Sequence, residues 1–166
     1  MFSTELGLTL EAAYREAAQR QHAYFCIEHL LYALLFDQGI VEVIRNCGGD
    51  EAVLKKDLED FFNKKVEQID KNKKHEEDDS IEPIQTIGVQ KILQSAIMHA
   101  HSAKKKQITS KDILVALYAE DDSDAVFFLK KQNISRLDII DFISHGVSKT
   151  NFSEDSSCLL YTSRCV

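Results

Sequence analysis

The stretch Thr109-Ser-Lys-Asp-Ile-Leu-Val-Ala-Leu-Tyr118 decides the fold, because the chain carries a second version of it, Cys26-Ile-Glu-His-Leu-Leu-Tyr-Ala-Leu-Leu35, 83 positions earlier. Each copy begins with a small polar residue and continues as an almost unbroken apolar run, the pattern of a helix buried on most sides. Residues 9–47 align with residues 92–130 without a gap. The seven identities are all apolar: Leu10/Leu93, Ala13/Ala96, Ala17/Ala100, Leu31/Leu114, Ala33/Ala116, Leu34/Leu117 and Val43/Val126.

Amphipathic helices are predicted before and after each buried run. Residues 4–21 and the segment from Thr86 onward each place apolar residues on one helical face. Short third helices follow, at Ile40–Cys47 and around Val126–Leu129, and fourth helices start at the N-caps Asp50 and Ser135. The inward residues expected for the last helix are Leu137, Ile140 and Ile143.

These segments predict an all-α fold: a pseudo-twofold, duplicated four-helix repeat with eight helices in one domain. The domain is expected to span residues 1–147, with repeat 1 at about 4–66, a mixed-charge connector at 67–85 and repeat 2 at about 86–146. Residues 148–166 are linker-like, and we interpret the last nine, from Cys158, as foreign to the natural protein.

Composition limits the classes of partner. The 166 residues carry a formal charge of −7, so we expect no binding to nucleic acid or to an anionic membrane. No apolar run approaches the length of a membrane span, and the start of the chain has no basic signal-peptide region, which favours the cytoplasm. The four cysteines form no CxxC pair and are expected to be free thiols.

No catalytic or metal-binding constellation is evident. The nucleotide-binding glycine motifs and the G-x-S-x-G and H-E-x-x-H motifs are absent. Cys26 and His29 have a spacing that could bring two metal ligands together, but no second pair accompanies them. The histidines are interpreted mainly as surface or capping residues, and the acids at 120–124 as residues preceding a helix. We therefore expect neither an enzyme nor a metal site.

The repeated helix with its Cys26-to-Leu35 motif resembles the Clp repeat of the Clp family of AAA+ unfoldases, with Cys26 where a threonine is usual. Ser135-Arg-Leu-Asp-Ile-Ile-Asp-Phe-Ile-Ser-His-Gly146 and the mixed-charge connector are similar to the A-type, ClpA-like branch. The resemblance covers residues 1–147. It implies an amino-terminal domain whose ATP and Mg²⁺ are bound by AAA+ modules outside this sequence, so that the fragment itself needs no cofactor.

The same resemblance implies a docking role. The domain would be a monomer that binds the adaptor ClpS and protein substrates, which the ATPase ring unfolds and delivers to the ClpP peptidase. The residues that correspond to the family's adaptor-binding face are Glu28 and, at the start of the second repeat, Thr86 and Lys91, with His99 on the same helix. Ala23 stands where the family can carry an acidic residue.

Two other interpretations remain open from the sequence. One is a free-standing helical module that binds proteins or peptides without an attached ATPase. The other is a small metal-dependent enzyme that uses Cys26, His29 and nearby acids.

Overall fold

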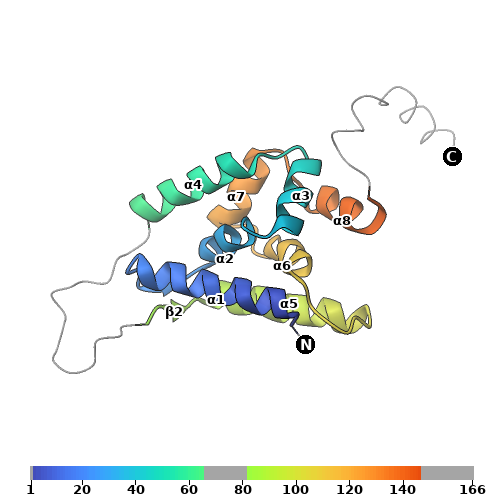
Figure 1. Ribbon diagram of the computed structural model, residues 1–166, viewed down its shortest axis with the longest axis horizontal. Helices are drawn as coiled ribbons and strands as arrows, with labels where there is room; N and C mark the ends of the chain where they lie inside the picture. The colour runs from blue at the N-terminus through green and yellow to red at the C-terminus, as the bar shows by residue number, and fades with distance from the viewer. Residues whose placement is uncertain (1, 66–81, 147–166) are drawn as a thin grey trace.

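The computed structural model describes residues 2–65 and 82–146 and forms eight helices and two short strands in that part of the chain (Figure 1). The predictions for residues 66–81 and 147–166, which include most of the connector and the tail, lie outside the described residues. The elements are α1 (Thr4–Gln19), β1 (Tyr24–Phe25), α2 (Ile27–Leu34), α3 (Gln38–Asn46), α4 (Glu51–Lys64), β2 (Ile84–Gln85), α5 (Ile87–Ser102), α6 (Ser110–Leu117), α7 (Asp124–Lys131) and α8 (Arg136–His145). The predicted all-α class with a duplicated four-helix unit is confirmed.

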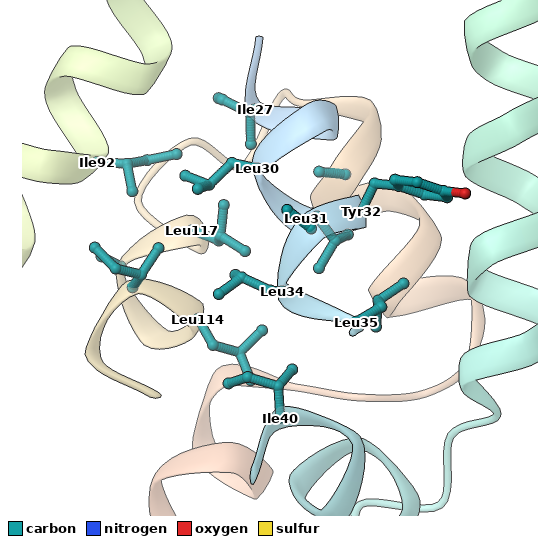
Figure 2. Close-up of a cluster of buried hydrophobic side chains, with 14 of the residues drawn as sticks. Ile27, Leu30, Leu31, Tyr32, Leu34, Leu35, Ile40, Ile92, Leu114 and Leu117 are labelled. Atoms are coloured by element: carbon teal, nitrogen blue, oxygen red, sulfur yellow. The ribbon is translucent and has the colours of Figure 1, made fainter. Parts of the chain in front are cut away.

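Helices α2 and α6 lie across the middle of the molecule, with α1 and α5 on one side and α3, α4, α7 and α8 on the other (Figure 1). Figure 2 shows Leu30 and Leu34 of α2 beside Leu117 and Leu114 of α6, with Ile92 of α5 next to them. All five side chains are fully buried. The two apolar runs that decide the fold are therefore its centre, as predicted.

Local side-chain bonds set where most helices begin. Asp50, Thr86 and Ser135 accept hydrogen bonds from the first turns of α4, α5 and α8, as their sequence positions predict. Thr109 and Asp112 form the predicted capping box at α6, in which Asp112 Oδ2 accepts the Thr109 N–H at 2.8 Å. None of the described helices is long and apolar enough to cross a membrane.

The two repeats are also joined by short parallel strand contacts. β1 pairs with β2, with Tyr24 opposite Ile84 and Phe25 opposite Gln85. Phe2 pairs with Ile108 in the same way. Phe2 lies 83 positions before Gln85, and Ile108 lies 83 positions after Phe25. In each case the residues before the first helix of one repeat pair with the residues before the second helix of the other repeat. This exchange of strands fixes the relative position of the halves.

The end of the connector differs from the prediction. Residues 67–85 are expected to be solvated, but Pro83 is buried and Ile84–Gln85 forms β2. The Tyr14 side chain is hydrogen-bonded to the carboxylate of Glu82, and its ring lies edge-on to Phe25 at 5.9 Å. Strand pairing and these contacts hold the last residues of the connector on α1.

Two predictions of register are wrong. The gapless match fails beyond Leu34 and Leu117, because the N-caps Asp37 and Ser123 lie 86 positions apart rather than 83. The connection from α6 to α7 is longer than the one from α2 to α3, and its extra residues are polar. In α8 Leu137 is 65% exposed instead of facing inward, and Ile139 is fully buried. Ile143 packs against the core, as expected.

Gln21 and Lys104, again 83 positions apart, both adopt the left-handed conformation after a long helix, with φ values of 57° and 55°. Glycine adopts this conformation without the steric cost of a Cβ. Lys104→Gly should therefore stabilise the protein by about 1 kcal/mol. Thermal unfolding would measure the gain, and Lys106→Gly, at an exposed site without positive φ, should show none. Equal effects of the two substitutions would contradict the prediction.

Candidate functional site

Three of the four predicted docking residues lie where α2, α5 and the beginning of α7 meet. Thr86 caps α5, and its Oγ1 accepts the Val89 N–H at 3.5 Å. Lys91, one turn later, is exposed, with its Nζ 3.8 Å from Glu120 Oε1 in the connection before α7. Gly88 allows α5 to approach α2 closely, since a Cβ there would lie only 2.8 Å from Ile27 Cδ1. The structure thus brings Thr86 and Lys91 next to the beginning of α2.

Glu28 occupies this junction but is only 6% exposed. Its Oε1 accepts the Ala125 N–H at 3.3 Å, in the first turn of α7. Burial raises the pKa of the Glu28 carboxyl. The expectation that Glu28 lies on the surface is therefore wrong. Its carboxylate accepts a hydrogen bond from an otherwise unpaired N–H in the first turn of α7, a helix of the second repeat. Any influence of Glu28 on a docked partner would act through the position of α7.

His99 lies apart from the other three. It is 13 residues beyond Thr86 along α5, a helical rise of about 20 Å. It is exposed and lines a separate hollow of about 220 Å³ together with Lys105, Asp112 and Ile143. The structure therefore divides the predicted residues into a group of three and one distant residue.

A buried pair of histidines lies beside the same junction. The Cys26 N–H donates to His29 Nδ1 at 3.1 Å, so the proton of neutral His29 is on Nε2. That Nε2 is 2.7 Å from His22 Nδ1, and the His29 ring stacks on Phe62 at 4.7 Å. The interpretation of His22 and His29 as surface residues is wrong, because both are buried, although His29 does act as a cap.

This arrangement makes the metal-dependent alternative unsuitable chemically. Both ring nitrogens of His29 already have partners, and burial raises the pKa of the Cys26 thiol to about 12. A thiol with such a pKa is neither a good nucleophile nor a good metal ligand at neutral pH. Among residues 2–65 and 82–146 there is no group of three or more histidine, cysteine or carboxylate side chains that could hold a metal ion.

An exposed apolar group adjoins Thr86, and the sequence analysis did not identify it. Tyr24 of β1 is 44% exposed, Ile84 of β2 is 64% exposed, and Ile87 at the beginning of α5 is 71% exposed. Their proximity follows from the pairing of Tyr24 with Ile84, which a single sequence does not reveal.

A hollow lies at the position related to this junction by the pseudo-twofold axis. It has a volume of about 720 Å³ and lies between the first half of α1, the α2–α3 connection and the start of α6. Leu8 and Phe36 give it an apolar wall, and Lys111 occupies the position that corresponds to Glu28. The two equivalent regions therefore differ in charge.

The Glu28 carboxylate should contribute to stability. Glu28→Ala leaves the buried Ala125 N–H without its acceptor and should cost about 1–3 kcal/mol of unfolding free energy. Glu28→Gln keeps an acceptor oxygen and should cost less. Urea unfolding measures both, with the exposed Glu42→Ala as control. Wild-type stability of Glu28→Ala would show that the bond is unimportant.

Acid should destabilise the protein through the histidine pair. Burial lowers the pKa of His22 below 6.5 and that of His29 to about 3. The unfolded chain therefore binds more protons just below pH 6.5, and stability present above that pH is lost as the pH falls. For His29 the loss between pH 6.5 and 5.5 should be about 1 kcal/mol, because the slope reaches its limit of about 1.4 kcal/mol per pH unit only below the unfolded pKa. The lowered pKa of His22 adds to the loss in the same direction.

The variant His22→Gln should reduce this slope, whereas His99→Gln, at an exposed position, should leave it unchanged. Unfolding free energies measured in urea at several pH values give the slopes. A wild-type slope equal to that of His22→Gln would contradict the assignment.

The comparisons with known proteins agree with this architecture. Residues 1–132 match the family described as Clp repeat (R) N-terminal domain. The chain is 33% identical over 148 residues to a ClpA homolog protein from Fuscovulum blasticum, covering 89% of this chain but 18% of that protein. The chain thus spans about a fifth of that relative's length.

Solved structures show the same fold at low sequence identity. The N-domain of ClpV in complex with a VipB peptide has a TM-score of 0.68 at 19% identity, over 87% of this chain and 85% of the other. The Hsp104 N-terminal domain from Candida albicans has a TM-score of 0.65 at 16% identity, over 83% and 85%. The ClpD N-terminal domain from Arabidopsis thaliana has a TM-score of 0.59 at 17% identity, over 83% and 88%. The chain therefore belongs to the Clp repeat N-terminal domain family, the non-catalytic N-domains of Clp/Hsp100 proteins.

Proposed function

We propose that this domain docks the adaptor ClpS and protein substrates for a ClpA-type unfoldase, which delivers them to ClpP in the cytoplasm. The observation that carries the proposal is the match to a ClpA homolog protein across 89% of the chain. The complex of the ClpV N-domain with a VipB peptide supports docking as a use of this fold. ATP and Mg²⁺ would be required by the AAA+ modules rather than by this domain.

We propose that Thr86 and Lys91 contact the adaptor directly. Of the three residues at the junction, Lys91 alone has a charged side chain that is exposed to a partner. Its ion pair with Glu120 is on the surface, so the pair contributes little to stability and can exchange for a partner's carboxylate. Glu28 would act beneath this surface by holding the beginning of α7. His99, by its distance, would belong to a separate contact.

Charge reversal at Lys91 tests the proposal. Lys91→Glu should weaken ClpS binding at least about tenfold, since a like charge facing a carboxylate costs more than a lost contact. Isothermal titration calorimetry with ClpS measures the Kd. Lys106→Glu, an equal charge change at another exposed lysine, should leave binding unaltered. No binding of ClpS to the unaltered domain at micromolar concentrations would refute the adaptor role.

A further inference from the structure

Strand β2 has one open edge. The N–H groups of Ile84 and Thr86 donate to the carbonyl oxygens of Ala23 and Phe25, at 3.0 and 3.1 Å. In a parallel ladder the residue between two such donors directs its own N–H and C=O to the opposite side. Gln85 therefore presents a backbone donor and acceptor away from β1, and it is exposed. Within residues 2–65 and 82–146, no third strand pairs with this edge, and β2 lies at the lower rim of the molecule in Figure 1.

The edge is held in a fixed position before any partner arrives. The contacts of Tyr14 with Glu82 and Phe25 anchor both strands on α1, and Thr86 passes directly from β2 into the capped start of α5. A strand edge that is already ordered can accept another strand without a large loss of conformational entropy.

Apolar side chains surround this edge. Tyr24, Ile84 and Ile87 are the exposed apolar group described above, and Lys91 follows Ile87 by four residues, on the same face of α5. The polar groups at the two ends differ in sign: Glu82 precedes β2 and Lys91 follows it. The surface thus combines a backbone hydrogen-bonding edge, apolar contacts and opposite charges at its ends.

The other repeat shows that the fold does not require apolar side chains at the positions of Tyr24 and Ile87. The residues 83 positions from Tyr24 and Ile87 are Gln107 and Thr4, which are exposed and polar. They lie at the equivalent strand contact, between Phe2 and Ile108. The fold is therefore compatible with polar side chains at the positions of Tyr24 and Ile87, although the other copy also exposes one apolar residue, Phe2, at its strand contact.

We infer that the open edge of β2 binds an extended peptide segment of a partner protein, which adds to β1 and β2 as a third strand. The segment would pair its backbone with Gln85 and place alternate apolar side chains against Ile84 and Ile87. A carboxylate at its end next to Lys91 would complete the charge match. The inference rests on the proposed docking function, because it specifies how part of the same surface recognises a partner.

The test uses the whole chain and a short fluorescein-labelled peptide of alternating valine and threonine with a glutamate at one end. Its matched control is the same peptide N-methylated at alternate residues, which keeps the side chains but removes the backbone donors along one edge. Fluorescence anisotropy should show the N-methylated peptide binding at least about tenfold more weakly. Equal affinity of the two peptides would overturn strand addition.

Protein variants test the same edge from the other side. Gln85→Pro removes the outward N–H but no bond to β1, and proline is compatible with an edge strand. It should weaken peptide binding about tenfold while the unfolding transition stays unchanged. Tyr24→Gln and Ile87→Thr introduce the residues of the other repeat and should also weaken binding. Met98→Thr, at an exposed apolar residue farther along α5, should not. Wild-type affinity of both Gln85→Pro and Ile87→Thr would overturn the inference.

Two further outcomes are decisive. If sedimentation shows that the chain self-associates through this edge, and that Gln85→Pro abolishes the association without affecting peptide binding, the occupant is a second copy and the inference is wrong. If the peptide binds as expected but ClpS does not bind at all, the adaptor role fails while strand addition stands. If ClpS binds in a way that depends on Lys91 but the peptide does not bind, strand addition fails while the adaptor role stands.

Discussion

The burial of α2 against α6 is the interaction on which the rest of the structure depends. Each helix has eight residues, too few to be stable in water on its own. Leu30 and Leu34 of one helix meet Leu114 and Leu117 of the other, so that neither apolar run faces solvent. A single repeat would leave half of this surface exposed. The amphipathic helices of both repeats are consequently positioned as covers for one central pair.

The exchange of strands follows from the same constraint. Once α2 and α6 are packed together, the residues just before each of them lie beside the first residues of the opposite repeat. The Thr86 N–H then donates to Phe25 O, and the Ser3 N–H donates to Ile108 O. These bonds satisfy backbone groups at helix starts and also fix where α1 and α5 begin. The docking junction at Thr86 is thus a product of contacts between repeats rather than of either repeat alone.

Features encoded in neighbouring residues could be predicted from the sequence, and features that depend on distant pairing could not. The caps at Asp50, Thr86, Thr109 and Ser135 involve residues within a single turn, and all were predicted. Strands of two residues have no periodicity, so β1 and β2 were missed. The burial of Glu28 depends on Ala125, a residue 97 positions away, which explains why its carboxylate was placed on the surface.

The duplication distinguishes residues of the common core from residues that are particular to one repeat. Positions whose apolar character is kept in both copies, such as Leu34 and Leu117, face the common core. Positions that differ serve one repeat alone: buried Glu28, which holds the beginning of α7, corresponds to Lys111, and exposed Ile87 corresponds to Thr4. Because the backbone is equivalent at both, each pair compares two side chains in one structural setting. An exposed isoleucine where a threonine suffices adds nothing to folding and carries a cost in solubility. Such a residue is best explained by contact with a partner.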